Sequence, residues 1–158
     1  MKQIIKKSFL FLFLFATINC GFKVIKESEN NNFAIQEIKT SGDKRINFKI
    51  KNNLLNSAKK NSENLVFIDL NTKKNKNIKE KNIKNEITKY EISLNVDIKF
   101  NLINDNTDHK ISLINKGSYL VADSYSTTLN NEKKIIDDLI ENISEKILRR
   151  ISLKLNDI

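Results

Sequence analysis

Apolar and polar residues alternate strictly between Tyr90 and Leu102. Every second position in this stretch carries a large apolar side chain, and the positions between them are polar. Successive side chains of a β-strand point to opposite faces, so the alternation predicts a strand with one buried and one wet face. A helix would scatter the same residues around its circumference. Such a strand is typical of an antiparallel sheet that is covered on one face only.

Two stretches repeat their apolar residues at every third or fourth position, which predicts amphipathic helices. The first begins after an N-cap at Asp43 and continues to about Ala58. The second begins after a cap at Asn130 and Asn131 and continues to about Leu155, with acidic residues early and basic residues late, as the helix macrodipole favours. We expect the uniform isoleucine face of the second helix to form the core rather than a ligand site. Both helices carry their apolar residues on or near one face. These residues are Ile46, Phe48, Ile50, Leu54 and Leu55 in the first helix, and Ile135, Ile136, Leu139, Ile140, Ile143, Ile147, Leu148 and Ile151 in the second.

Three further segments also predict strands. They cover residues 33–38, residues 65–70 and residues from about 110 to 128. Gly117 interrupts the last of these and indicates a bulge or bend. The segment from Lys73 to Lys89 is rich in lysine and has few large apolar residues. It forms either a long hairpin with a charged tip or, in part, a loop.

The predicted order of elements is strand, helix, strand, strand, strand, helix. A largely antiparallel sheet with one wet face needs helices on its other face. We therefore expect an α+β fold, a two-layer sandwich in which two helices pack on one face of a mainly antiparallel four-stranded sheet. The length of 158 residues suits one domain, which we place at residues 33–158. Residues 20–32 are mainly polar and predict a tether.

The amino-terminal segment, residues 1–19, has the pattern of a secretory signal. Lysines come first, and an apolar run of mainly phenylalanine and leucine follows. This run is too short to cross a hydrocarbon core of roughly 30 Å as a helix. Cys20, the only cysteine, comes directly after the signal, and its placement resembles the lipobox of bacterial lipoproteins, in which the thiol receives a diacylglyceryl group. Ile18 fits the lipobox pattern, whereas Thr17 and Asn19 depart from it.

Lipidation of Cys20 would anchor the chain stably, because each acyl chain, such as palmitate, contributes about 0.8 kcal/mol per buried methylene. No aspartate follows Cys20, which favours the outer membrane, with the domain on its periplasmic side. An ordinary signal peptide with a chance cysteine and an uncleaved membrane anchor are the alternatives.

The charge of the chain predicts anionic partners. Removal of the leader takes away three lysines and no acid, so the net charge falls from +9 to +6. A basic domain beside a membrane attracts lipid headgroups, glycolipid phosphates or acidic protein surfaces. Nucleic acid is not expected as a partner, because an exported protein does not meet it.

Residue types that carry catalysis are scattered along the chain. His109, the only imidazole, lies beside Asp108 in the turn-rich segment 104–108, where we expect it to be solvated. Cys20 would be consumed by lipidation. The sequence contains no nucleophile elbow, no carboxylate cluster with ligand spacing and no phosphate-binding loop. We therefore expect no enzymatic activity, no metal and no cofactor.

Several short stretches, taken together, resemble the LptE family of lipopolysaccharide-assembly lipoproteins. The resemblance covers nearly all of the mature chain, which is shorter than many members. It implies two helices on a four-stranded sheet and a non-enzymatic role. The protein would lie as a plug inside the β-barrel of LptD and assist the delivery of lipopolysaccharide to the outer leaflet. The stretches are Cys20-Gly21-Phe22, the helix opening at Gly42-Asp43-Lys44-Arg45 and continuing to Leu54, Ser124-Tyr125-Ser126 and the terminal KILRRISLKL.

The resemblance also implies basic residues near the path of lipopolysaccharide. We expect Lys79, Lys81 and Lys84 to engage phosphates of lipid A as point charges, and a solvated charged hairpin is the alternative. Two other functions stay open: an auxiliary lipoprotein of a phospholipid or other ABC-type transport system, and a periplasmic adaptor of peptidoglycan enzymes.

Overall fold

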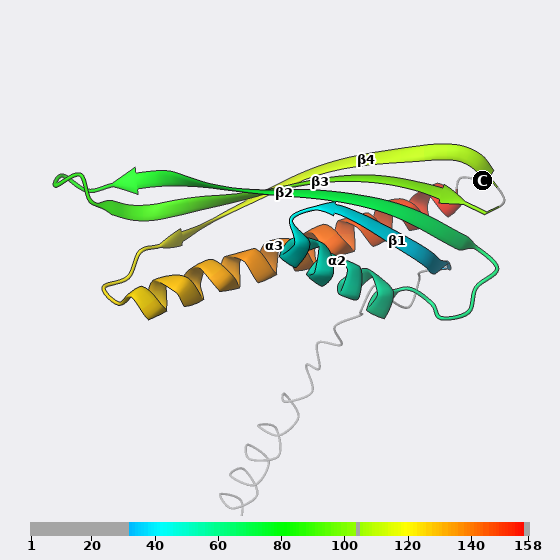
Figure 1. Cartoon of the computed structure of the whole chain (residues 1–158), viewed down its shortest axis with the longest axis horizontal. Coiled ribbons are helices and arrows are strands. Elements are labelled where there is room, and N and C mark those ends of the chain that lie inside the picture. The colour runs from blue at the N-terminus through cyan, green and yellow to red at the C-terminus, as the bar shows by residue number, and fades with distance from the viewer. Residues whose placement is uncertain (1–31, 104, 157–158) are drawn as a thin grey trace, which may run out of the picture.

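The computed structural model describes residues 32–103 and 105–156. The order strand, helix, strand, strand, strand, helix is the predicted one. The signal segment, Cys20 and the tether up to residue 31 lie outside the described residues. The elements are β1 (Ala34–Gly42), α2 (Lys44–Ser57), β2 (Leu65–Lys81), β3 (Ile87–Leu102), β4 (Asp105–Leu120) and α3 (Tyr125–Asn156) (Figure 1).

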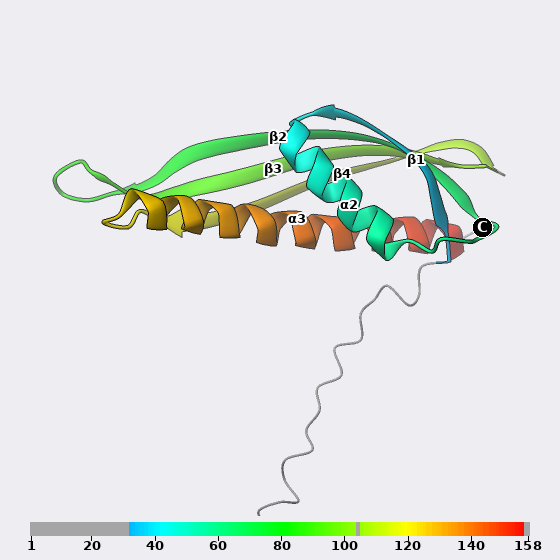
Figure 2. The same cartoon turned by 60° about the horizontal axis from the view of Figure 1, so that its bottom comes forward.

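The four strands form one sheet in the order β1-β2-β3-β4. β1 and β2 pair in parallel, and the two other neighbouring pairs are antiparallel. α2 supplies the crossover connection that a parallel pair requires. Both helices lie on the same side of the sheet (Figures 1 and 2). The predicted α+β fold, a two-layer sandwich with a mainly antiparallel sheet, is confirmed.

The helix-facing side of the sheet and the apolar faces of both helices form the core. The alternation on β3 is confirmed, because every apolar residue from Ile92 to Phe100 at its alternate positions is no more than 2% exposed. α3 contributes buried isoleucines at positions 140, 143, 147 and 151. Burial of each such side chain stabilises the fold by about 1.5–3 kcal/mol, so the isoleucine face of α3 packs as core, as predicted.

α2 begins where the sequence predicts. The Oδ1 atom of Asp43 accepts hydrogen bonds from the backbone N–H groups of Arg45 and Ile46, at 3.0 and 3.1 Å, which is the N-cap arrangement. The predicted apolar face is correct in part. Phe48 is 66% exposed and Leu55 is 43% exposed. At 3.6 residues per turn, both positions point away from the face that carries Ile46, Ile50 and Leu54.

The lysine-rich segment is a hairpin, one of the two alternatives left open by the sequence. β2 and β3 pair from Val66 opposite Leu102 to Lys81 opposite Ile87. The tip is a turn in which the Asn82 Oδ1 atom accepts hydrogen bonds from the backbone N–H groups of Lys84 and Glu86, at 2.9 and 3.0 Å. The hairpin reaches past the end of β4 and past the start of α3 (Figures 1 and 2).

The structure corrects the predicted boundaries between β4 and α3. β4 begins at Asp105, inside the segment expected to be a turn, and ends at Leu120 rather than at residue 128. α3 begins at Tyr125 and not after Asn130 and Asn131. The Ser124 hydroxyl accepts a hydrogen bond from the Thr127 N–H, at 3.3 Å, and so supplies the cap. Asn131 instead donates its side-chain N–H to the Leu120 carbonyl, at 3.1 Å.

The predicted bulge at Gly117 is also wrong. Gly117 pairs with Ile92 in an unbroken register. A Cβ atom at this position would come within 2.9 Å of the Ile135 Cγ2 atom. Glycine therefore lets α3 approach β4 closely.

Candidate functional site

The described part of the chain has no metal-binding cluster. In residues 32–103 and 105–156, no group of three or more His, Cys, Asp or Glu side chains lies close enough to hold an ion. None of the helices described is long and apolar enough to cross a membrane. His109 lies on β4 rather than in a turn, is only partly exposed, and stacks on Phe100 with ring centroids 5.0 Å apart. The predicted turn position of His109 is therefore wrong, because β4 extends through this segment, although the side chain keeps partial exposure to solvent.

The three lysines expected to bind phosphate all lie at the outer end of the β2–β3 hairpin. The Lys79 Nζ atom is 3.8 Å from Glu91 Oε2 and donates to the Ser118 hydroxyl at 3.3 Å. Lys81 donates to Asn85 Oδ1 at 2.9 Å. Lys84 is exposed, and its side chain makes no hydrogen bond or ion pair with another described residue. The hairpin thus presents Lys84 openly, while Lys79 and Lys81 each have a partner within the sheet or the turn.

A polar cluster fixes the base of this hairpin to α3 on the helix-facing side. The Lys76 Nζ atom lies 2.6 Å from Glu132 Oε2, and the Tyr119 hydroxyl donates to the same oxygen at 2.7 Å. Lys76 also lies over the Tyr90 ring, 4.4 Å from its centroid, and Tyr90 stacks on Tyr119 at 5.7 Å. β2, β3, β4 and α3 each contribute one residue, so the cluster joins the strands to the helix.

Burial and hydrogen bonding act in opposite directions on the charges of this cluster. Burial alone raises the pKa of Glu132, but the hydrogen bonds from Lys76 and Tyr119 and the positive charges of Lys76 and Lys74 outweigh it, so the pKa is lowered. Burial alone lowers the pKa of Lys76, and the contacts with Glu132 and Tyr119 raise it overall. The pKa of Tyr119 is raised, first by burial and then by its bond to Glu132. The charged forms of Glu132 and Lys76 are thus both favoured, which is the behaviour of a structural ion pair.

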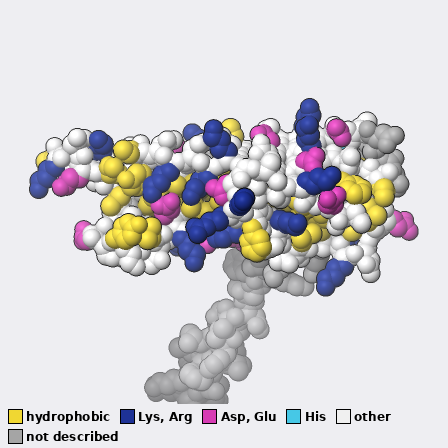
Figure 3. Space-filling view, in the orientation of Figure 1, with side chains coloured by type: hydrophobic (Ala, Val, Ile, Leu, Met, Phe, Trp, Pro, Cys, Tyr) yellow, Lys and Arg dark blue, Asp and Glu magenta, His cyan; other side chains and the backbone are white. Residues whose placement is uncertain are grey.

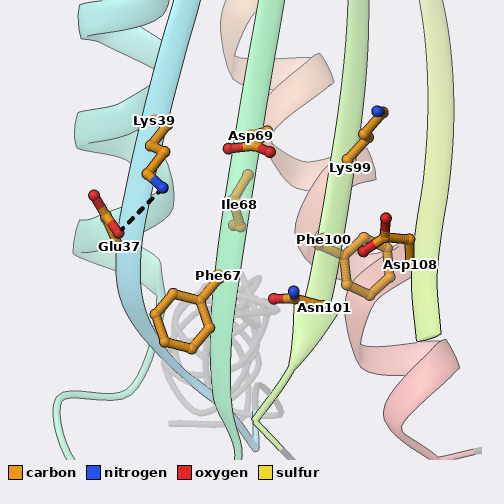
Figure 4. Close-up of a pocket in the computed structure, with 9 residues that line it drawn as sticks. All are labelled: Glu37, Lys39, Phe67, Ile68, Asp69, Lys99, Phe100, Asn101 and Asp108. Atoms are coloured by element: carbon orange, nitrogen blue, oxygen red, sulfur yellow. Dashed lines mark ion pairs between the residues drawn. The ribbon is translucent and has the colours of Figure 1, made fainter. Parts of the chain in front are cut away.

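The open face of the sheet is polar and slightly hollow at one end. Side chains from all four strands line a cavity of about 230 Å³ (Figure 4). Acidic and basic groups are mixed in this cavity, and Glu37 and Lys39 form an ion pair at 3.9 Å. This charge balance suits contact with water or with another hydrophilic surface, and it favours neither anions nor cations. The lining residues are Glu37, Lys39, Phe67, Ile68, Asp69, Lys99, Phe100, Asn101 and Asp108.

A larger groove of about 560 Å³ lies between α2 and α3, beside β2. Phe48, Leu129 and Ile136 supply its apolar floor, and Phe48 and Leu129 are exposed. Lysine and arginine side chains gather in the same part of the molecule (Figure 3). This groove has no local signature in the sequence, because its residues come from three elements. The available signal was Phe48, which lies off the buried face of α2 among basic neighbours.

Comparison with solved structures identifies proteins of the same fold. Rare lipoprotein B from Shewanella oneidensis superposes with a TM-score of 0.58 at 14% identity, covering 76% of this chain and 97% of that one. A protein assigned as a lipoprotein from Caulobacter crescentus gives a TM-score of 0.54 at 15% identity, over 76% and 90% of the two chains. Lipoprotein B from Nitrosomonas europaea, described as uncharacterized, gives 0.50 at 13% identity, over 80% and 88%.

No protein-family model matches the chain, and no curated protein matches it in sequence. At identities of 13–15%, the likeness to the solved structures establishes the shared fold.

Proposed function

We propose that this chain is an outer-membrane lipoprotein, anchored through Cys20 on the periplasmic side, that assists lipopolysaccharide assembly as the partner of an LptD-like β-barrel. The observation that carries the proposal is the shared architecture with rare lipoprotein B over 97% of that chain. The position of Cys20 directly after an apolar leader agrees with it. The barrel partner and the lipopolysaccharide are proposed on the basis of the sequence resemblance to the LptE family.

The surfaces of the domain suit this role in different ways. The open face of the sheet is polar and mixed in charge, so it matches the polar interior of an outer-membrane barrel. The hairpin presents lysines at the far end of the molecule, where they would meet phosphates of lipopolysaccharide as point charges. The helix-facing side of the sheet is occupied by the core and has no part in either contact.

Co-purification from native membranes tests the proposal. The full chain, tagged at its carboxyl end, is extracted from outer membranes in mild detergent, and the proteins retained with it are identified by mass spectrometry. We expect a single large β-barrel protein in stoichiometric amount. A matched control is a tagged, unrelated lipoprotein extracted in the same way. Recovery of an inner-membrane ABC complex, or of a penicillin-binding protein, in place of the barrel would overturn the proposal.

A further inference from the structure

The groove between α2 and α3 combines an apolar floor with a rim of positive charge. Its floor is unusual for a surface, because Phe48 is 66% exposed and Leu129 is 45% exposed. Ile136 of α3 continues the apolar surface between them and is half-buried. The volume of about 560 Å³ lies in the range of small-molecule sites.

Most of the positive charges on the rim have no ion-pair partner among the described residues. Lys44 and Arg45 come from the first turn of α2, Lys74 from β2 and Lys133 from α3, and all four line the groove. They are exposed, and none of their side chains makes a hydrogen bond or ion pair with another described residue, although the charge of Lys74 helps to lower the pKa of Glu132.

The acidic residues of the groove, by contrast, are already engaged. Asp43 accepts the backbone N–H groups at the start of α2. Glu132 is bound by Lys76 and by Tyr119. Asp137 pairs with Lys49 across the two helices. The groove therefore carries five cations against three carboxylates, two of which are ion-paired, so positive charge is in excess, unlike on the balanced open face of the sheet.

We propose that this groove binds an anionic amphiphile, with one acyl chain on Phe48, Leu129 and Ile136 and a phosphate or carboxylate headgroup held by Arg45 and Lys133. Arginine binds a phosphate through two parallel N–H groups, and lysine binds it as a point charge. Burial of the exposed phenylalanine by an acyl chain supplies the apolar part of the binding energy. The proposal goes beyond the proposed function, because it needs neither the barrel nor the lysines of the hairpin.

Native mass spectrometry of the full chain in a non-ionic detergent tests this site. The probes are 1-oleoyl-lysophosphatidic acid, oleate, 1-oleoyl-lysophosphatidylcholine and inorganic phosphate. We expect one molecule of lysophosphatidic acid per chain, and weaker binding of oleate, which carries a single carboxylate. The zwitterionic lipid and inorganic phosphate should each bind at least about tenfold more weakly, since each lacks one half of the recognition.

Variants assign the binding to the groove. The double substitution Arg45→Gln with Lys133→Gln removes the headgroup contacts, and Phe48→Ser removes part of the floor. All three residues are exposed, and circular dichroism checks that each variant is folded. Each variant should bind lysophosphatidic acid at least about tenfold more weakly. Matched controls are Lys84→Gln on the hairpin and Leu153→Ser, which is 54% exposed near the end of α3; both should bind normally.

Several results would contradict the proposal that the groove binds an anionic amphiphile. One is equal binding by the variants and the native chain. Another is full competition by inorganic phosphate alone, which would show an anion site without an acyl chain. Capture of an acidic protein segment by the groove, with no lysophosphatidic acid bound, would assign it to a protein partner. Loss of the barrel partner in the co-purification leaves each of these readouts unchanged, so the two proposals fail separately.

Discussion

At the residue scale, one buried polar side chain joins β1, α2 and β2. Asn47 is 3% exposed, donates to the Ser41 carbonyl at 2.8 Å and accepts a hydrogen bond from the Thr72 hydroxyl at 2.8 Å. In residues 32–103 and 105–156, every buried side-chain nitrogen or oxygen has a hydrogen-bond partner. Substitution of Asn47 therefore removes the donor to the Ser41 carbonyl and leaves the Thr72 hydroxyl only its longer bond to the Asp43 carbonyl, at 3.3 Å.

Replacing Asn47 by alanine should lower the free energy of unfolding by about 1–3 kcal/mol, because the Ser41 carbonyl loses its side-chain donor and the Thr72 hydroxyl loses the shorter of its two hydrogen bonds. Urea denaturation followed by circular dichroism measures this change. Asn56→Ala on the exposed side of the same helix is the control and should cost much less. Equal effects of the two substitutions would show that the buried hydrogen bonds contribute little.

The two glycines of the sheet differ in what an added methyl group would meet. Gly42 has φ 89°, and a Cβ atom there would lie 2.0 Å from the Thr72 backbone oxygen. At Gly117 the nearest atom is the Cγ2 atom of Ile135, at the end of a side chain. Gly42→Ala should therefore lower the free energy of unfolding by at least about 2 kcal/mol, and Gly117→Ala by clearly less. Thermal melting of both variants ranks them, and the reverse order would contradict the explanation.

At the scale of elements, the apolar periodicity predicted the helices and strands that are held by core packing. It failed for the segments that are held by polar contacts. The alternation from Tyr90 to Leu102 predicted β3, because each apolar position faces the helices. The sequence did not decide whether the outer half of β2 is a strand or a loop, since its helix-facing positions include Lys74 and Lys76 instead of large apolar residues. Pairing with β3 and the contacts of Lys76 with Tyr90 and Glu132 compensate for the missing apolar pattern. The periodicity of a sequence carries no information on such contacts between distant segments.

The start of α3 was predicted too late for a related reason. Two asparagines led to the prediction of a cap at residues 130 and 131, whereas the Ser124 hydroxyl caps the helix six residues before Asn130. The exposed first turns of α3 carry few large apolar residues and so give no helical periodicity. The groove between α2 and α3 was likewise invisible, since it needs the crossing of two helices that lie far apart in sequence.

The ion pair between β2 and α3 makes the stability of the domain depend on pH. The pKa of Glu132 is lowered in the folded state from the ordinary value of 4.5. Its stabilising contribution is therefore fully present above pH 4.5 and is lost as the pH falls through the lower, folded pKa. The raised pKa of Lys76 means that the contribution of this amine is present below pH 10.5 and is lost as the pH rises through the higher, folded pKa.

Glu132→Gln should lower the melting temperature at pH 7 and should make it less sensitive to acid. The difference in melting temperature between the native chain and the variant is measured from pH 3 to pH 7. It should shrink as the pH falls below 4.5, because the unfolded chain binds protons there first and the native carboxylate becomes protonated only near its lower, folded pKa. Glu80→Gln on the exposed hairpin is the control, since its partner Lys89 lies on the neighbouring strand and not on α3. A difference that stays constant with pH would contradict the ion-pair explanation.

At the scale of the whole molecule, the domain separates three surfaces of different character. The sheet offers a polar open face, the hairpin offers lysines at one end, and the helices form a groove with a basic rim. The sequence predicted the first two, because alternation and charge runs are local. It named the hairpin lysines as contacts for phosphates of lipid A, but it did not predict which surface meets a protein partner, because such a surface is built from segments far apart in the sequence.

The hairpin lysines provide a direct test of lipopolysaccharide contact. Replacing Lys79, Lys81 and Lys84 together by serine should weaken binding of the full chain to lipopolysaccharide at low salt by at least about tenfold, since each lysine would contribute a charge-assisted contact. Lys110→Ser, on the exposed part of β4, is the control. Surface plasmon resonance at two salt concentrations measures both. Unchanged binding by the triple variant would show that the hairpin is merely solvated.

The proposed function depends most directly on Cys20, because a lipid anchor at that sulfur would fix where the domain works. Mass spectrometry of the amino-terminal peptide, taken from native protein in separated membrane fractions, tests this. We expect the peptide to begin at Cys20, to carry a diacylglyceryl group on the sulfur and an acyl group on the amine, and to be found in the outer-membrane fraction. An unmodified thiol in a freely soluble fraction would contradict the account.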